Sequence, residues 1–467
     1  MRILLIEPDK TPVVIGSEDF SIYEPLALEY VAAGVSKVHE VKILDLRIEN
    51  TLKDTLQKFS PDVVGITSYT VQVNIVLSLF KQIKLLNPKI LTVVGGHHAT
   101  IMPEDFISDD IDVIVIGEGI FTFRELVSRY EKGIEFEGIT GIAVSGNGSL
   151  KKSGLVGQVD LDAFPFPERQ LTKKYREHYY SYWMKPLASI RTSKGCPYRC
   201  NFCAMWKLTN GKYFKRTPQK IVEELEGIEE KYVFFADDES LLDVPRMMKL
   251  AELIKEKGIQ KRYFLYGRSD TISRNPELIR LWREIGLERV FVGLEFFRDE
   301  DLKYILKRST VDDNNKAVKI LQELDIDIYA SFIVRPEFTK NDFAELRSYI
   351  QKLKLDFAAF TVLTPLPGTD LFNEVESKLI TRNYDFFDFI HTVLPTKLPL
   401  KEFYKEYLHL YKKGITLWRS ILTLRKYPRK EILSLIKKSL HTYKRFEKAY
   451  LDYKVKENKP NIFINTR

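Results

Sequence analysis

Three cysteines, Cys196, Cys200 and Cys203, constrain this chain more than any other feature, because they are all the thiols in 467 residues. They follow Gly195 in the stretch SKGCPYRCNFCAMW at the spacing C-x3-C-x2-C. This spacing is too short for a disulfide framework and the count is odd, so the pattern is typical of a reducing compartment where thiols serve metals or catalysis. The fold must therefore present one short loop that carries three thiols.

Three clustered thiolates indicate an iron–sulfur centre with one coordination site left open. Cubane clusters are normally held by four cysteine thiolates, and this chain supplies three. A loop of this spacing can wrap around a compact polynuclear centre, and Gly195 allows a close approach. Two alternatives stay open at this point: reduced thiols without a metal, and a zinc site of three cysteines and one histidine, although the second cysteine knuckle usual for structural zinc is missing.

Apolar, β-branched runs alternate with helical stretches over the first 135 residues. The runs RILLIEP, VKILDL, DVVGITSY, LTVVGGHH and DVIVIGEG predict buried parallel strands, with helices such as 25–34 and 71–86 between them. This pattern predicts a five-stranded doubly wound domain, in which ligands lie at the carboxyl ends of the strands. Those ends carry TSYT, GGHHAT and GEG, whose small residues let a large flat ligand approach the backbone.

A second alternating pattern follows a polar, then proline-rich segment at about 138–168. It predicts strands over 187–191, 232–236, 263–266, 290–295, 326–334 and 357–363, with helices between them. The helix after the cysteine loop has Thr217 as its N-cap and Pro218 in its first turn. Six βα units predict an open or partial barrel. Active sites of parallel barrels gather where the strands end, and the three cysteines follow the first strand.

The motif GCPYRCNFC resembles the signature loop of the radical S-adenosylmethionine superfamily. A doubly wound domain ahead of such a barrel resembles the cobalamin-binding subclass, and the resemblance covers nearly the whole chain. It implies an α/β protein in four parts: an N-terminal Rossmann-like cobalamin-binding domain over 1–137, a hairpin and linker over 138–185, a partial (βα)6 radical SAM barrel over 186–375, and a helical, basic C-terminal region over 376–467. The cofactors implied are a 4Fe-4S cluster, S-adenosylmethionine and cobalamin.

The resemblance also assigns residues to these cofactors. Cys196, Cys200 and Cys203 would hold the cluster, and S-adenosylmethionine would chelate the open iron. The residues implied for S-adenosylmethionine are Phe202, Asp237, Asp238, Arg268 and Glu295, with Glu239 next to the two aspartates, although DDE replaces the usual GGE. The cobalamin contacts implied are Ser68, Tyr69, Thr70, Gly95, Gly96, His97, Gly117 and Glu118, with His98 as a further candidate. The D-x-H-x-x-G motif is missing, so no histidine ligand is expected from that loop. No catalytic side chain is assigned.

By resemblance, the chain is an enzyme that cleaves S-adenosylmethionine reductively to modify an unactivated carbon. The stretches TRNYDFFDFIHTVLPTKLPLKEFYKE and PLPGTDLF are similar to hopanoid C-3 methylase-like proteins, which implies methyl transfer to a hopanoid or isoprenoid membrane lipid. Two alternatives are radical carbon–carbon bond formation or cyclisation on an archaeal tetraether lipid, and a non-catalytic cobalamin and iron–sulfur sensor. The partners expected are a lipid or other hydrophobic small molecule, and a reductase, ferredoxin or flavodoxin as electron donor.

The net charge of +8 belongs to the tail, where residues 412–459 contain 15 Lys or Arg and four acids. Apolar residues recur there at helical spacing: Ile415, Trp418, Ile421 and Leu422, then Ile432, Leu435, Ile436 and Leu440 after Pro428. Such basic helices either lie on an anionic membrane surface or pack on the body with solvated lysines. No aromatic platform for nucleic acid, no long apolar run and no signal peptide are evident. We therefore expect a cytoplasmic protein, peripheral at the inner face of the membrane in the first case.

Overall fold

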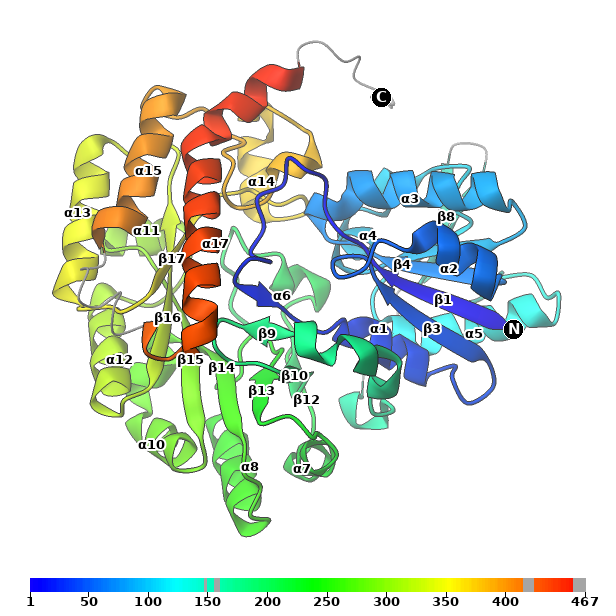
Figure 1. Cartoon of the computed structure of the whole chain (residues 1–467), viewed down its shortest axis with the longest axis horizontal. Helices are drawn as coiled ribbons and strands as arrows, with labels where there is room; N and C mark the ends of the chain where they lie inside the picture. The colour runs from blue at the N-terminus through cyan, green and yellow to red at the C-terminus, as the bar shows by residue number, and fades with distance from the viewer. Residues whose placement is uncertain (147–148, 155–159, 415–423, 457–467) are drawn as a thin grey trace.

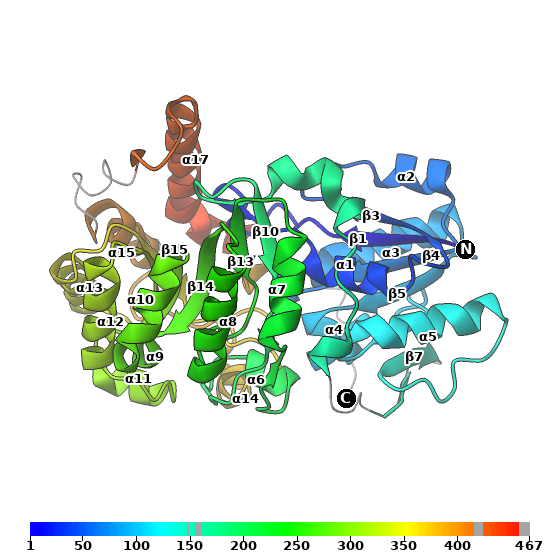
Figure 2. The same ribbon diagram turned by 90° about the horizontal axis from the view of Figure 1, so that it is seen from below.

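The structure is a computed structural model that describes residues 1–146, 149–154, 160–414 and 424–456. Two sheets, one mostly and one wholly parallel, lie side by side with their covering helices, the N-terminal half at the right of Figure 1 and the barrel at the left. Figure 2 shows the same two halves from below. The predicted α/β class, with a doubly wound domain before a partial barrel, is confirmed.

The N-terminal sheet has seven strands in the order β3-β1-β4-β5-β6-β7-β8. Its five parallel strands are the five predicted: β1 (Arg2–Glu7), β3 (Glu40–Asp45), β4 (Val63–Thr67), β5 (Leu91–Gly95) and β6 (Val113–Val115). They are buried almost throughout because helices cover both faces. α1 (Leu26–Ala33) and α5 (Gly119–Glu131) pack on one face, and α2 (Leu52–Phe59) and α3 (Val73–Leu86) pack on the other.

The predicted hairpin is present, but it extends the first sheet instead of only linking two domains. β7 (Ile142–Gly146) pairs antiparallel with β6, and β8 (Ser149–Lys152) pairs antiparallel with β7. The boundary at residue 137 stays a prediction, and the strand pairing places the hairpin physically with the first half. The rest of the connection holds the 3-10 segments η3 (Leu161–Ala163) and η4 (Arg169–His178), and β9 (Tyr180–Ser181), which pairs with β2 (Ser21–Ile22).

The barrel is a six-stranded, wholly parallel sheet in sequence order, as the six predicted βα units require. Its strands are β10 (Leu187–Ile190), β13 (Tyr232–Phe235), β14 (Arg262–Arg268), β15 (Leu287–Glu295), β16 (Asp327–Val334) and β17 (Ala358–Val362). The first and last strands do not pair with each other, so the barrel is partial. Its strand ends gather the side chains of the site described below.

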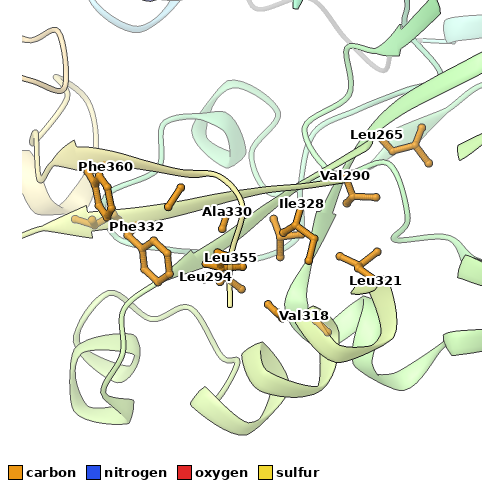
Figure 3. Packing of buried hydrophobic residues seen from close by; sticks show 14 of the residues in the cluster. Leu265, Val290, Leu294, Val318, Leu321, Ile328, Ala330, Phe332, Leu355 and Phe360 are labelled. Carbon is orange, nitrogen blue, oxygen red and sulfur yellow. The ribbon is translucent and has the colours of Figure 1, made fainter. Parts of the chain in front are cut away.

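Helices cover the outside of the barrel and bury its main hydrophobic core. They are α7 (Pro218–Glu226), α8 (Val244–Glu256), α9 (Ser269–Arg274), α10 (Pro276–Glu284), α11 (Asp299–Tyr304), α12 (Val311–Glu323) and α13 (Lys340–Lys352). Figure 3 shows Val318 and Leu321 of α12 directed at Ile328 and Ala330 of β16. The predicted start of α7 is confirmed, since the Thr217 side chain accepts from the Lys220 amide.

The C-terminal region contains α14 (Asp370–Val375), α15 (Leu400–Gly414), α17 (Arg429–Lys448) and the 3-10 segments η5 (Glu376–Lys378), η6 (Tyr384–Phe386) and η7 (Ala449–Lys456). α17 begins directly after Pro428, as predicted, and in Figure 1 it runs across the front of the barrel half beside α15. The predicted apolar positions Ile415, Trp418, Ile421 and Leu422 lie outside the described residues. None of the described helices combines the length and the apolar run needed to cross a membrane.

Candidate active site

The cysteine loop leaves the carboxyl end of β10 and is closed at its base by a short ladder. β11 (Ser193–Lys194) pairs antiparallel with β12 (Phe214–Lys215), so the chain between them is pinned at both ends. Gly195 has φ +88°, a left-handed conformation. A Cβ there would overlap the Lys212 carbonyl oxygen and lie 2.6 Å from Thr209 Oγ1, so the loop needs glycine at this position.

Two aspartates after β13 hold the start of this loop. The Asp237 carboxylate accepts from the Thr192 and Ser193 amides at 2.7 and 2.8 Å and from the Thr192 hydroxyl at 2.5 Å. Asp238 Oδ2 accepts from the Gly195 amide at 2.6 Å. Both carboxylates therefore position the cysteine loop. Their predicted contact with S-adenosylmethionine stays a prediction, and both oxygens of Asp237 are already engaged.

The three cysteines form no disulfide; Cys200 is buried, and Cys196 and Cys203 are partly exposed. Burial raises the pKa of the Cys196 thiol to about 11 and that of Cys203 to about 12, and the neighbouring Cys200 thiol adds to both shifts. The thiols thus lie close enough to influence one another, and those of Cys196 and Cys203 are neutral until a metal displaces the proton. In the described ranges, no three His, Cys, Asp or Glu side chains surround a single-ion site. A cubane has a different requirement, because each of its thiolates binds a separate iron.

Trp206 of α6 (Met205–Leu208) supports the loop from the side. Its buried indole Nε1 donates to the Cys200 carbonyl oxygen at 3.0 Å. The predicted Phe202 is partly buried and packs against the barrel core, which fixes the segment between the second and third cysteines. The sequence analysis missed Trp206, whose only local signal is an aromatic residue close behind the last cysteine.

A charged cluster at the ends of β13 and β14 faces the cysteine loop. The Arg268 guanidinium stacks 3.6 Å from the ring centroid of Tyr198, between the first two cysteines, and its Nε donates to Asp270 at 2.9 Å. Glu239 is buried, and its Oε1 has no hydrogen-bond partner among the described residues. Burial raises the pKa of Glu239 to about 7, against the lowering effect of nearby Arg268. An unpaired buried carboxylate oxygen is costly unless a ligand completes it, so Glu239 fits a cationic group.

Glu295 ends β15 in a strained turn. Its φ is +58°, and the pairing with β16 shifts register between Gly293 and Glu295. Bulges of this kind re-aim a side chain next to an active site. Here the carboxylate meets Lys307, whose Nζ lies 2.7 Å from Oε1, and both side chains are buried. Sequence reasoning missed Lys307, because it follows α11 without any motif. The predicted S-adenosylmethionine contact of Glu295 stays a prediction.

An interdomain cavity of about 510 Å³ lies between the carboxyl edge of the first sheet and the first strands of the barrel. From the first sheet it is lined by six of the eight predicted cobalamin residues: Tyr69, Gly95, Gly96, His97, Gly117 and Glu118. From the barrel it is lined by residues that include Lys194, Met205, Asp238 and Tyr266. A Cβ on Gly95 would meet no protein atom closer than 3.7 Å, so packing does not demand glycine there. The absence of a Cβ at Gly95 leaves room for a ligand.

Two predicted cobalamin residues, Ser68 and Thr70, do not line this cavity. The Ser68 hydroxyl is turned inward to the Tyr69 carbonyl, and Thr70 bonds the ring of His98 at 3.1 Å. His98 is buried and also meets Asp105 at 2.8 Å, so it is a packed histidine. His97 instead lines the cavity, edge-on to Tyr69. Burial and the cations of Arg191 and Lys194 lower the pKa of His97 to about 4, so the imidazole is neutral at pH 7.

Two protein-family models match the chain, one on each side of the interdomain cavity. Residues 12–127 match the B12 binding domain, and residues 190–350 match the radical SAM superfamily. The first range contains all eight residues predicted for cobalamin, and the second begins at the end of β10 and contains the three cysteines.

Individual proteins resemble the chain over most of its length. The hopanoid C-3 methylase of Methylococcus capsulatus is 31% identical over 424 residues, which cover 88% of this chain and 81% of that protein. An uncharacterized methyltransferase of Pyrococcus horikoshii is 30% identical over 85% of this chain and 88% of its own. The solved structure of the cobalamin-dependent S-adenosylmethionine radical enzyme OxsB has a TM-score of 0.71 and 16% identity, covering 98% of this chain and 73% of that one, and supports the fold.

Proposed function

This chain belongs to the cobalamin-binding family of radical S-adenosylmethionine enzymes, and we propose that it methylates an unactivated carbon of a hopanoid or another isoprenoid membrane lipid. It is a radical S-adenosylmethionine methyltransferase, and its cofactors are a 4Fe-4S cluster, S-adenosylmethionine and cobalamin. When bound, these groups supply carbon-centred radical chemistry and a transferable methyl group. No acid, base or nucleophile of the protein could supply either of them. The chain itself orients the reactants and keeps water out.

For the cluster, Cys196, Cys200 and Cys203 are the thiolate donors in this proposal. They are the only thiols of the chain, and they share one pinned loop. Asp237 and Asp238 keep that loop in place through backbone amides, as described above. A cubane held at three corners leaves its fourth iron for S-adenosylmethionine.

For S-adenosylmethionine, we assign Glu239 as the contact of its ammonium group and Arg268 as the contact of its carboxylate. Glu239 has the unpartnered buried oxygen, and Arg268 stacks on the ring of Tyr198 in the cysteine loop. A carboxylate near a guanidinium is a charge-assisted pair with defined geometry. Asp238 and Glu295 are left to contact the remainder of the cofactor, and Phe202 to support the loop.

We assign the interdomain cavity as the binding site of cobalamin. Gly95, Gly96 and Gly117 give it a flat wall of backbone, and His97 and Tyr69 line it. Because His97 lines the cavity and packs against Tyr69, we assign it a contact with the cofactor tail. Ser68 and Thr70 shape the same edge from behind. The cavity also reaches Asp238, so it adjoins the cysteine loop.

The lipid substrate is supported by one structural observation, the outer face of α17. Leu433, Ile436 and Leu440 are 73%, 41% and 55% exposed, and the helical spacing places them on one stripe. Several lysines and arginines flank the stripe on the same helix. A basic helix with an exposed apolar stripe suits attachment to an anionic membrane surface, where a lipid substrate would be collected. The helix also packs on the body through buried Thr442 and Phe446, as the other interpretation of the tail predicts.

The experiment uses protein reconstituted without oxygen, supplied with cobalamin, a reductant, S-adenosylmethionine with a deuterated methyl group, and diploptene as acceptor. We expect release of 5′-deoxyadenosine and a lipid product heavier by one deuterated methyl group in mass spectrometry. Both signals should be lost in Cys203→Ala. A product that has only lost hydrogen would favour cyclisation or coupling. No 5′-deoxyadenosine under strong reduction would favour the sensor and contradict the proposal. Comparing flavodoxin and ferredoxin as reductants identifies the class of electron donor.

A further inference from the structure

A second cavity lies where the N-terminal loop 8–20, the edge strand β17 and α17 meet. Its volume is about 530 Å³, within the usual range of about 300–1,000 Å³ for ligand pockets. Aromatic side chains dominate its wall, among them Phe20, Tyr182, Tyr329, Phe357, Tyr427 and Tyr443. We propose that this aromatic cavity binds the fused-ring or isoprenoid body of a neutral, apolar substrate. The inference rests on the proposed function and deepens it.

Backbone strain singles out the same cavity. Nine non-glycine residues in the described chain have positive φ, and only two of these are aromatic: Tyr182 at +57° and Phe389 at +65°. Both line this cavity. A bulky side chain in the left-handed region is strained, and such strain persists where the surroundings impose it, often at ligand sites. The Tyr182 amide donates to the Phe20 carbonyl at 2.8 Å, and Phe389 accepts from the Val362 amide at 2.6 Å. The fold therefore holds two aromatic rings against this space.

Four of the six charged residues on the wall have ion-pair partners within the protein, which favours a neutral occupant. Lys10 is paired with Glu18, Arg47 lies 2.6 Å from Asp45, and Asp388 lies 2.8 Å from the ring of His391. These pairs satisfy one another within the protein, so a charged ligand would have to break them to gain a partner. A neutral ring system loses nothing of this kind, and it gains contact with the flat aromatic faces.

The aromatic cavity adjoins the interdomain cavity. Arg47 lines both of them. Ring contacts also lie between the two cavities: Tyr329 of the aromatic cavity meets Phe291 at 5.0 Å, and Phe291 meets Tyr266 of the interdomain cavity at 4.7 Å. The body of a substrate held in the aromatic cavity would therefore lie next to the cavity assigned to cobalamin.

α17, the helix with the exposed apolar stripe, lines one side of the aromatic cavity. Leu435, Ser439 and Tyr443 of α17 line it from the inner side, while the stripe of Leu433, Ile436 and Leu440 faces out. The two faces of one helix thus connect the surface where an apolar molecule would be collected with the space that would receive it.

The test is equilibrium binding of dehydroergosterol, a neutral fluorescent sterol delivered from cyclodextrin, to the cofactor-loaded full chain without reductant. Energy transfer from tryptophan reports binding, since the Trp183 ring lies edge-on to Tyr427 of the cavity wall, with 5.9 Å between the ring centroids. Ser439→Phe and Ala359→Phe both place a ring into the aromatic cavity, and we expect each to weaken binding at least tenfold. Ser434→Phe, on the exposed side of the same helix, is the matched control and should bind like the unmodified chain.

Release of 5′-deoxyadenosine in the absence of lipid should persist in all three variants, which verifies that they fold. Lack of saturable binding by the unmodified chain, or unchanged binding in both cavity variants, would overturn the inference, and so would tighter binding of cholesteryl sulfate than of the neutral sterol. If only the proposed function is wrong, the chain still binds the sterol but forms no methylated lipid. That result differs from a failure of this inference, in which sterol binding itself is lost.

Discussion

Glu118 Oε2 accepts a hydrogen bond from Lys194 Nζ at 2.8 Å, across the seam between the first sheet and the barrel. Arg191 approaches the same carboxylate at 3.5 Å. Glu118 follows the carboxyl end of β6, and Lys194 directly precedes Gly195 of the cysteine loop. This pair therefore fixes the distance between the glycine-rich edge of the first sheet and the cysteine loop.

Replacing Glu118 by Gln should loosen this seam. Burial alone would raise the pKa of Glu118, but Lys194 and Arg191 hold it below its ordinary value, so the carboxylate is charged at neutral pH. Its loss leaves two cations facing each other, and we expect a cost of roughly 1.5–3 kcal/mol, which lowers the unfolding temperature by a few degrees in calorimetry. A cycle with Lys194→Met should be non-additive, and strict additivity would show that the pair does not couple the halves.

Gly195→Ala should damage the cysteine loop more than Gly211→Ala. Both glycines have positive φ, at +88° and +70°, so both variants carry the conformational penalty. Only Gly195 lacks space for a Cβ, whereas the atoms nearest to a Cβ on Gly211 are 3.8 Å away. We expect Gly195→Ala to lose roughly 1–3 kcal/mol more in stability and most of its iron after reconstitution. Equal iron content in the two variants would contradict this account.

His391 should make the stability of the C-terminal region fall as the pH rises. The imidazole is buried between Asp388 at 2.8 Å and Asp452 at 3.0 Å. Burial alone would lower its pKa, but the two carboxylates raise it to about 9. Because the folded pKa exceeds the unfolded value of about 6.5, the contribution is complete below about pH 6.5 and lost as the pH rises through about 9. That window corresponds to roughly 3 kcal/mol.

Calorimetry across this pH window checks the prediction. His391→Gln should flatten the fall in unfolding temperature, while His178→Gln, at an exposed position, should keep it. If the unmodified chain shows no fall between about pH 6.5 and 9, the imidazole is not held in its charged form by the two carboxylates.

The outer stripe of α17 should determine membrane attachment. We expect the triple variant Leu433→Ser, Ile436→Ser, Leu440→Ser to bind phosphatidylglycerol vesicles at least tenfold more weakly in sedimentation, because buried apolar side chains contribute about 1.5–3 kcal/mol each. Leu85→Ser on α3, which removes a leucine that is 77% exposed, is the control and should bind normally. Binding should also weaken in high salt. Equal sedimentation of the triple variant would place the membrane contact elsewhere.

The sequence was sufficient for the parallel strands and for the cysteine loop. Strands buried on both faces are nearly continuous apolar runs, so Leu91–Gly95 and Asp327–Val334 stand out without any tertiary information. The start of α7 was equally local, because an N-cap hydroxyl followed by proline acts within one turn. The cysteine spacing lies in eight consecutive residues and needs no fold to be recognised.

The remaining features depend on tertiary pairing. Asp237 clamps Thr192, which lies 45 residues away, and no local pattern announces that bond. Lys307 reaches Glu295 only because β15 ends in a bulge. The backbone conformation after β4 turns the Ser68 hydroxyl inward and directs Tyr69 to the interdomain cavity. The hairpin of β7 and β8 joined the first sheet because β6 offered it a free edge.

We propose that the thiolates of Cys196, Cys200 and Cys203 hold an iron–sulfur cubane whose fourth iron takes S-adenosylmethionine. The most direct measurement is electron paramagnetic resonance of anaerobically reconstituted, reduced protein before and after addition of S-adenosylmethionine. We expect a cubane signal that shifts on addition and is absent from Cys196→Ala, Cys200→Ala and Cys203→Ala. A chain that takes up no iron and sulfide, or a signal that S-adenosylmethionine leaves unchanged, would contradict it.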